Sequence, residues 1–208
     1  MKTKIFLTGF RGAGKTALAK LLAEKLDFEL IEMDKLIVKR AGKSIAEITK
    51  QGKDWYGFRQ LESEVLKDII KKENIVVATG GGLFVNDIEF STPLEKISLT
   101  GSKGLTFGEY NYNLVKDIPG KLIIFLKVNE KVLRERLKKG ESENYNKKWR
   151  PSLTKNKNEI EENIKIYRHR LLFYKKRADV ILDTSNQEPE ESLRKIFKIL
   201  KHENIIRY

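Results

Sequence analysis

A glycine-rich segment near the beginning of the sequence constrains the fold more than any other feature. It runs Gly9-Phe10-Arg11-Gly12-Ala13-Gly14-Lys15-Thr16 and fits the phosphate-binding pattern G-x-x-x-x-G-K-[ST]. Its glycines permit backbone angles that other residues resist, so successive N–H groups can turn inward around a chain of phosphates. The pattern places Lys15 at the β- and γ-phosphates of a nucleotide and the Thr16 hydroxyl on Mg²⁺.

The segments on either side of this loop support the same interpretation. Residues 4–8 form a short apolar run that predicts a buried parallel strand, and residues 17–26 repeat Leu and Ala at helical spacing. Strand, glycine loop and helix follow one another in the order that a phosphate-binding loop requires. The alternative is a glycine turn that binds no ligand.

The rest of the chain alternates between predicted strands and helices. Further strands are expected at about 28–31, 74–78, 122–126 and 179–182, and helices at about 44–50, 55–72, 130–138, 159–176 and 189–201. The helix that begins after Ser44 has the Ser-x-x-Glu form of a capping box. This alternation is typical of an α/β fold in three layers, with a central five-stranded parallel sheet and helices on both faces. We expect one domain over residues 1–208.

Composition excludes several classes of function. The chain has no cysteine and only two histidines, His169 and His202, which argues against thiol catalysis, a zinc site and a Ser-His-Asp hydrolase. The absence of a long apolar run and of room for a signal peptide predicts a cytoplasmic protein that contacts no membrane. The net charge is +13, but acidic residues are interspersed among the lysines, so we expect anionic small molecules rather than nucleic acid as partners.

Further polar residues indicate what the site binds besides a nucleotide. Glu32 and Asp34 are two residues apart at the end of the second predicted strand, hence on one face, where one carboxylate could serve Mg²⁺ and the other accept a proton. The run Gly80-Gly81-Gly82 would let the backbone approach a ligand closely. Arg59, with Glu62 three residues on, and Arg170 would together suit a carboxylate.

These features, in this order, make the chain similar to the shikimate kinases. The matching segments are Gly9–Thr16, Glu32-Met33-Asp34, Ser44–Ile48, Phe58-Arg59 with Glu62, Ala78–Gly82, Arg150–Leu153, Arg170 with Tyr174, and Ala178–Val180 before Asp183-Thr184. The resemblance covers most of the chain. It departs from the family at Glu32, where the family has Asp, and between Gly82 and Leu122, which is a longer stretch than the family usually has.

The resemblance implies the fold of a P-loop kinase and the ATP-dependent phosphorylation of the 3-hydroxyl of shikimate in aromatic amino-acid synthesis, by a monomer. It implies a lid at about 140–153, with Arg150 meeting the transferred phosphoryl group, and a substrate-binding helical region at about 34–60. Lys15, Asp34 and Arg150 would be catalytic, and Thr16 and Glu32 would hold Mg²⁺. The residues expected at ATP are Gly12, Ala13, Gly14, Lys15, Thr16, Ala17, Arg136 and Arg150. The residues expected at shikimate are Asp34, Arg59, Gly80, Gly81, Gly82 and Arg170.

Three questions stay open at this point. The alternation of apolar and polar residues around Gly101–Gly104 predicts a β-hairpin inserted at about 97–107, or else an irregular loop. A related small-molecule kinase, such as a gluconate kinase, would share the fold and the phosphate loop. A non-catalytic binding module of the same fold is the alternative from a different class.

Overall fold

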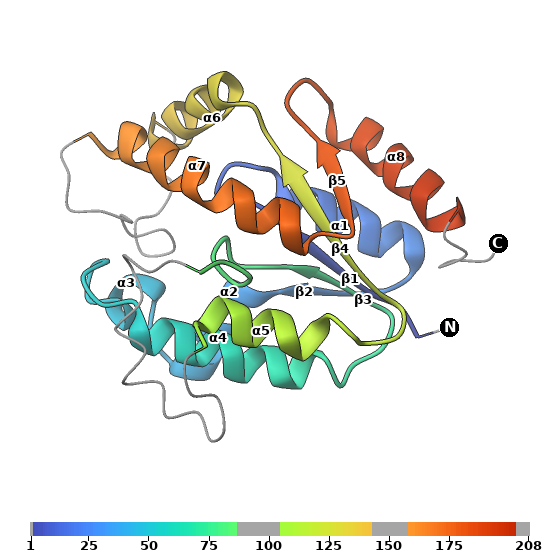
Figure 1. The fold of residues 1–208 in the computed structure, drawn as a ribbon, viewed down its shortest axis with the longest axis horizontal. Coiled ribbons are helices and arrows are strands. Elements are labelled where there is room, and N and C mark those ends of the chain that lie inside the picture. The colour runs from blue at the N-terminus through green and yellow to red at the C-terminus, as the bar shows by residue number, and fades with distance from the viewer. Residues whose placement is uncertain (1, 87–104, 143–157, 203–208) are drawn as a thin grey trace.

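The computed structural model describes residues 2–86, 105–142 and 158–202. Within these ranges it contains one sheet of five parallel strands in the order β2-β3-β1-β4-β5 (Figure 1). The strands are β1 (Lys4–Thr8), β2 (Glu29–Glu32), β3 (Ile75–Ala78), β4 (Lys121–Lys127) and β5 (Val180–Asp183). The described helices are α1 (Lys15–Leu26), α2 (Met33–Ala41), α3 (Ile45–Ile48), α4 (Tyr56–Ile69), α5 (Phe107–Val115), α6 (Glu130–Ser142), α7 (Glu159–Arg177) and α8 (Pro189–His202).

The central strand explains why the sheet is stable. All five residues of β1 are buried, and the strand pairs with β3 on one side and β4 on the other. Phe6 lies in register with Val77 and with Ile123, and each of these three side chains has no exposed surface. A strand buried on both faces needs a continuous apolar sequence, which is the pattern that residues 4–8 carry.

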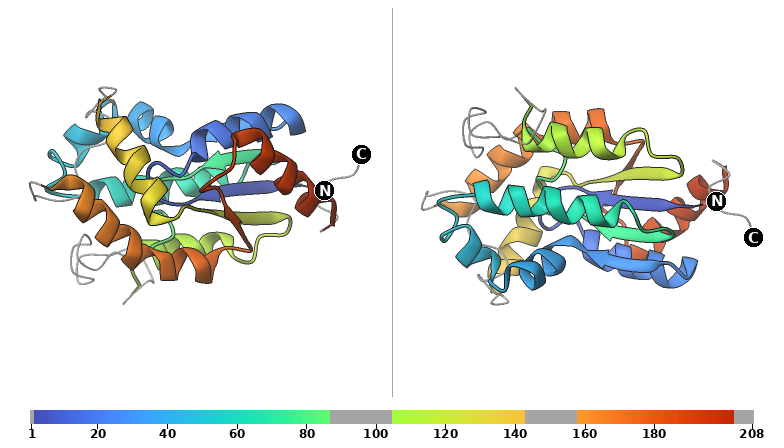
Figure 2. Two further views of the ribbon diagram at one scale, coloured as in Figure 1. Left: turned by 90° about the horizontal axis from the view of Figure 1, so that it is seen from above. Right: turned by 90° about the horizontal axis from the view of Figure 1, so that it is seen from below.

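Helices cover both faces of the sheet and place the site at one edge. Helices α1 and α8 lie on one face, and α5 and α7 lie on the other (Figure 2). Since all five strands are parallel, their carboxyl ends meet at the same edge. After β1 the chain forms β2 and β3 on one side of it, and then β4 and β5 on the other side. The order of the strands therefore reverses next to β1, and α/β sheets bind ligands at such a switch point.

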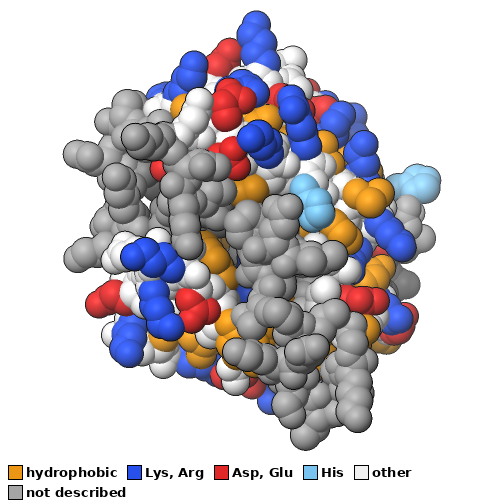
Figure 3. Space-filling view, turned by 60° about the vertical axis from the view of Figure 1, so that its left-hand side comes forward, with side chains coloured by type: hydrophobic (Ala, Val, Ile, Leu, Met, Phe, Trp, Pro, Cys, Tyr) orange, Lys and Arg blue, Asp and Glu red, His pale blue; other side chains and the backbone are white. Residues whose placement is uncertain are grey.

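The three-layer prediction is confirmed, and so is the capping box. The Ser44 hydroxyl accepts a hydrogen bond from the Glu47 N–H, while the Glu47 carboxylate accepts one from the Ser44 N–H at 2.8 Å. Among the described helices, none combines the length and the apolar character that a membrane crossing requires. Basic and acidic side chains are interspersed on the face shown in Figure 3, as the sequence indicated.

Two local predictions were wrong. Asp34 does not share a strand face with Glu32, because β2 ends at Glu32 and Asp34 lies in the first turn of α2. The second strand of the predicted hairpin at 97–107 is absent, because Thr106 caps α5 by accepting a hydrogen bond from the Glu109 N–H at 3.2 Å. The first strand of that hairpin and most of the lid expected at 140–153, including Arg150, lie outside the described residues.

Candidate active site

The glycine loop between β1 and α1 has the shape of a phosphate-binding loop. Gly14 caps α1 with a φ of 89°, a left-handed conformation that favours glycine, and no side chain caps the first turn of this helix. Gly9 has a φ of 144°, and a Cβ atom there would lie 2.8 Å from the Leu126 carbonyl oxygen. The loop therefore packs against the end of β4, and the N-terminus of α1 can bind an anion.

Lys15 lies across this loop. Its Nζ atom donates to the carbonyl oxygens of Gly9 at 2.8 Å and Phe10 at 3.0 Å. The ammonium group is thus held directly at the segment whose backbone would surround the phosphates. Because the interaction with these carbonyls is one that anionic phosphate oxygens can replace, the geometry suits the role that the sequence pattern gives to Lys15.

A cavity of about 250 Å³ opens beside the loop at the carboxyl ends of the strands. It brings together side chains and backbone from the glycine loop, β2, α2, α4, the turn after β3, and α7. The residues that line it are Arg11, Lys15, Thr16, Glu32, Met33, Asp34, Lys35, Ile45, Trp55, Phe58, Arg59, Glu62, Ala78, Thr79, Gly80, Gly81, Gly82 and Arg170. Phosphate-binding groups and the two arginines expected at a carboxylate therefore share one cavity.

Arg59 and Glu62 form a buried ion pair on α4. Only 6% of Arg59 and none of Glu62 is exposed, and the Arg59 guanidinium donates to Glu62 Oε2. The guanidinium carbon also lies 5.6 Å from the Trp55 ring centroid and 5.7 Å from that of Phe58. Burial raises the pKa of the Glu62 carboxyl against the lowering effect of Arg59, and the nearby Asp34 charge raises this pKa further. The arginine is therefore held in a fixed orientation on the cavity wall.

The triple glycine has a structural reason that the sequence alone did not reveal. A Cβ atom at Gly80 would overlap Glu62 Oε1, and one at Gly82 would overlap the Arg59 guanidinium. The turn after β3 thus lets this ion pair approach the backbone, in addition to any approach by a ligand. Any larger residue at Gly80 or Gly82 would displace the pair.

Glu32, which is expected to bind the metal, and Asp34, which is expected to bind the acceptor hydroxyl, both line the cavity. Glu32, the last residue of β2, pairs with Lys35 at 2.6 Å, and its side chain is 22% exposed. Asp34 lies in the first turn of α2, where the helix dipole favours a negative charge. It also lies beside the triple glycine, since a Cβ atom at Gly80 would be 3.6 Å from Asp34 Oδ1.

Arg170 reaches the same cavity from α7 on the other side. It is 3% exposed, and its guanidinium donates to the Gly81 carbonyl oxygen over 3.4 Å. Tyr174, one turn further along α7, donates to the same oxygen at 2.5 Å and stacks on Phe125 with ring centroids 4.8 Å apart. Helix α7 is thereby joined to the turn after β3, which sets the position of Arg170.

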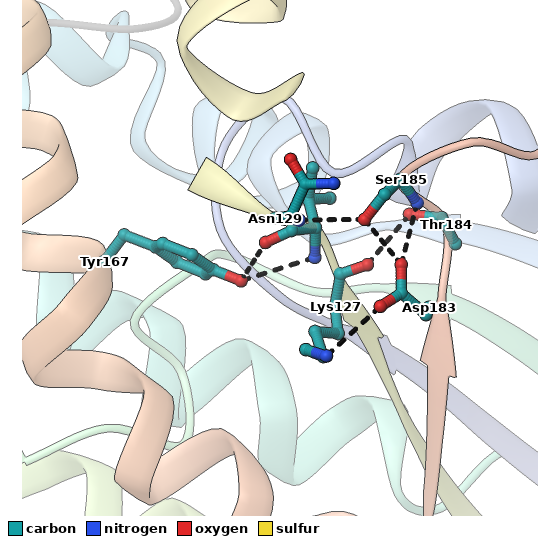
Figure 4. A network of polar contacts seen from close by, with 7 residues as sticks. Lys127, Asn129, Tyr167, Asp183, Thr184 and Ser185 are labelled. Carbon is teal, nitrogen blue, oxygen red and sulfur yellow. Dashed lines mark hydrogen bonds and ion pairs between the residues drawn. The ribbon is translucent and has the colours of Figure 1, made fainter. Parts of the chain in front are cut away.

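Arg136 lies apart from this cavity. Its guanidinium donates to the Thr184 carbonyl oxygen at 2.7 Å and to that of Gly12 at 3.4 Å, so it links α6 to the glycine loop and to the segment after β5. A polar network holds that segment on the end of β4 (Figure 4): the Asn129 N–H donates to Ser185 Oγ at 2.8 Å, and the Thr184 N–H donates to the Lys127 carbonyl oxygen at 2.8 Å. Arg136 therefore lies against the glycine loop but outside the cavity.

Sequence reasoning missed several residues of the cavity wall. Arg11 and Met33 line it but were not predicted at the site, and Lys35, Ile45, Trp55 and Phe58 lie in the substrate-binding region expected at about 34–60 but were not singled out. Trp55 and Phe58 precede Arg59 by four residues and one residue, and an aromatic residue beside a buried arginine could have indicated a stacking role. Gly12, Ala13, Gly14 and Ala17, expected at the nucleotide, belong to the glycine loop and the start of α1 but do not line this cavity.

Comparisons with known proteins show the family of this chain. The family model described as shikimate kinase matches residues 11–201. A shikimate kinase of Caldicellulosiruptor bescii is 32% identical over 195 residues, which cover 94% of this chain and 94% of that protein. A shikimate kinase of Clostridium botulinum is 45% identical over 92 residues, which cover 44% of this chain and about half, 54%, of that relative.

A solved structure shows the same fold. It is that of a shikimate kinase from Acinetobacter baumannii in complex with shikimate, and it superposes with a TM-score of 0.74 at 22% identity. The superposition covers 98% of this chain and 95% of the other. Because the family model spans nearly the whole sequence, and a full-length relative exceeds 30% identity, this chain belongs to the shikimate kinase family.

Proposed function

We propose that this chain transfers the γ-phosphoryl group of ATP to the 3-hydroxyl of shikimate, which yields shikimate 3-phosphate for aromatic amino-acid synthesis. The observation that carries this proposal is the set of residues that line the cavity at the carboxyl ends of the strands. Lys15 and Thr16 of the phosphate loop, the carboxylate of Asp34, and the buried arginines Arg59 and Arg170 all line it. Two substrates of different chemistry, a nucleotide phosphate and a hydroxylated acid, can thus meet there.

Each group has a chemical task in phosphoryl transfer. Lys15 would stabilise the charge on the transferred group, and Asp34 would hold the acceptor hydroxyl and take up its proton. Arg59 and Arg170 would bind the substrate carboxylate, with Gly80, Gly81 and Gly82 against the ring. Phosphoryl transfer depends mainly on positioning and on charge stabilisation, so no stronger general base is needed.

The residues present also fit Mg²⁺. The hydroxyl of Thr16 and the carboxylate of Glu32 line the cavity beside the loop, and Mg²⁺ with a nucleotide is usually held by one or two protein oxygens, phosphates and waters. No group of three or more metal-ligating residues occurs in the described part of the chain, and nucleotide-bound Mg²⁺ does not require one. When bound, the ion would neutralise phosphate charge.

An assay of ATP consumption tests the proposal. We expect ATP turnover to depend on shikimate and to be slow with gluconate, because the chain belongs to the shikimate kinase family. Turnover with gluconate but not with shikimate would assign the chain to another small-molecule kinase. No turnover with either acid, together with measurable ligand binding, would indicate a binding module.

Arg59→Ala and Arg170→Ala should each weaken shikimate binding far more than ATP binding. Each variant removes charge-assisted hydrogen bonds to the carboxylate, a loss of about 1.5–3 kcal/mol. Arg59→Ala should in addition destabilise the fold by roughly 3–5 kcal/mol, because it leaves Glu62 buried without its cation. Separate calorimetric titrations with the two ligands, plus thermal unfolding, measure these effects.

Arg168→Ala is the matched control for these arginines. Arg168 lies on α7 two residues before Arg170, but its side chain is 58% exposed and pairs with Glu130. Shikimate affinity should remain within about twofold of wild type, since exposed ion pairs contribute little. Equal losses for ATP and shikimate in the Arg59 or Arg170 variant would mean that the arginine serves the nucleotide or the fold.

Glu32→Asp should change the Mg²⁺ dependence of turnover with little effect on shikimate binding. The shorter side chain restores the residue that the family has at this position, and we expect it to be tolerated or mildly beneficial. Titration of activity with Mg²⁺ measures the shift. Glu29→Asp, at the opposite end of β2 where Glu29 pairs with Lys72 at 2.5 Å, makes the same change away from the cavity and should leave the titration unaltered. An unchanged Mg²⁺ titration in Glu32→Asp would remove Glu32 from the metal site.

A further inference from the structure

Phe10, at a position where the phosphate-loop pattern accepts any residue, is almost fully buried. Only 1% of its surface is exposed, although its neighbours Arg11 and Gly12 are half-buried. In such a loop the backbone N–H groups, the lysine and the hydroxyl bind the phosphates, so the pattern makes no demand on this side chain. The direction of the Phe10 ring, into the protein, therefore calls for a different explanation.

The ring contacts helix α7 at two residues one turn apart. Its centroid lies 5.6 Å from that of Tyr167, with the ring planes at 54°. The guanidinium carbon of Arg170 lies over the Phe10 ring, 5.6 Å from the centroid, which is within the range of a cation–π interaction. Both Arg170 and Phe10 are nearly excluded from solvent, and such an interaction is stronger when desolvated.

Tyr167 makes the support beneath Phe10 rigid. Its hydroxyl donates to the Val128 carbonyl oxygen at 2.5 Å and accepts from the Val128 N–H at 3.3 Å (Figure 4). The ring is 2% exposed and is thus held to the end of β4 through both of its hydrogen-bonding functions. Phe10 therefore contacts both this fixed ring and the guanidinium of Arg170.

We propose that Phe10 is a positioning residue that holds Arg170 in the orientation that binds the substrate carboxylate. This inference rests on the proposed function of Arg170. The guanidinium of Arg170 donates to the Gly81 carbonyl oxygen at 3.4 Å, and the aromatic face of Phe10 beneath it, at 5.6 Å, adds a second contact that sets its orientation. Phe10 thus belongs to the nucleotide-binding loop, but its side chain contacts the arginine that binds the carboxylate of the acid substrate.

The same residue touches both substrate sites through different atoms. Its carbonyl oxygen accepts hydrogen bonds from Lys15 Nζ at 3.0 Å and from the Ala13 N–H at 3.2 Å, while its side chain contacts Arg170. A substitution that keeps an apolar side chain leaves the carbonyl in place and removes only the aromatic face. Nucleotide binding and acid binding are therefore separable at this position.

The experiment compares Phe10→Leu and Phe10→Met with wild type by calorimetric titration. Both variants keep an apolar side chain of similar size and lack the π face. We expect the Kd for shikimate to rise about threefold to thirtyfold, the range between an exposed and a desolvated cation–π contact, and the Kd for an ATP analogue to change less than about twofold. The KM for shikimate should rise in parallel, with a smaller change in kcat.

Phe6→Leu is the matched control. Phe6 lies in β1, has no exposed surface and packs against Phe84 at 6.1 Å, and no contact of its ring with an arginine is present among the residues described. It should lose thermal stability as the Phe10 variants do, because each substitution removes a buried ring. Its Kd for shikimate should stay within about twofold of wild type.

A double-mutant cycle with Arg170→Ala decides whether Phe10 acts through Arg170. If it does, Phe10→Leu should raise the Kd for shikimate much less in the Arg170→Ala background than in wild type. Additive effects, or equal losses for shikimate and the ATP analogue, would overturn the inference while leaving the proposed function standing. Failure of the wild-type protein to bind shikimate would instead overturn the proposed function.

Discussion

Replacing Lys15 with alanine should reduce turnover by at least about 10²-fold while the protein stays folded, since a pre-positioned charge at the reacting phosphate contributes on this scale. In the structure the ammonium group donates to the carbonyl oxygens of Gly9 and Phe10 in the glycine loop. These bonds lie within seven residues of sequence, so their loss should affect the loop and not the sheet. A coupled ATPase assay and circular dichroism measure the two quantities.

Lys20→Ala is the control for this variant. Lys20 lies on the exposed side of α1, in the same helix that Lys15 begins, and its substitution removes the same charge. Turnover should remain within about twofold of wild type, because distant surface charges are screened by salt. A folded Lys15→Ala protein with near-normal turnover would exclude Lys15 from the mechanism.

Replacing Asp34 with asparagine should lower kcat by about 10²–10⁴-fold, the usual effect of removing a group that transfers a proton in the transition state. The substitution preserves shape, so ATP affinity should change little. It also removes the negative charge that raises the pKa of Glu62, so the pKa of Glu62 should fall in this variant. Steady-state kinetics with each substrate varied in turn separates the effect on kcat from the effect on the KM for ATP.

Asp68→Asn provides the matched comparison. Asp68 lies on α4 and pairs at the surface with Arg40 and Lys71, outside the cavity wall. The same isosteric loss of charge at Asp68 should leave kcat unchanged and barely alter the free energy of unfolding, because exposed ion pairs contribute little. If Asp34→Asn altered only the Mg²⁺ requirement, the roles of Asp34 and Glu32 would have to be exchanged.

The elements with a strong local pattern were predictable from sequence to within a few residues. The apolar run at residues 4–8 matches β1, and the helix predicted from about Glu159 to Lys176 matches α7, which ends one residue later. The capping box at Ser44 was also read correctly, because its signal lies within four consecutive residues. In each case the structure depends on residues close together in the sequence, so their periodicity or a short polar motif predicts it directly.

The errors arose where local patterns are ambiguous. The Leu36-Ile37-Val38 run of α2 is as apolar as a strand, and only the burial of Met33 and Ile37, four residues apart, shows the helical face. Leu105-Thr106-Phe107 alternates like a strand, yet Thr106 and Glu109 have the spacing of a helix cap, the signal that was used at Ser44. A short apolar run does not distinguish a helix from a strand until its packing partners are known.

The sequence by itself determined the phosphate loop, the parallel sheet and the residue types of the site, because these depend on motifs and periodicities confined to short segments. Only the tertiary structure showed that Gly80 and Gly82 leave room for the Glu62–Arg59 pair, and that Phe10 lies beneath Arg170, 160 positions further along the chain. Contacts between segments so far apart depend on how the strands order and the helices pack. No local pattern encodes that arrangement, so the orientation of the two arginines toward one cavity was decided by the fold.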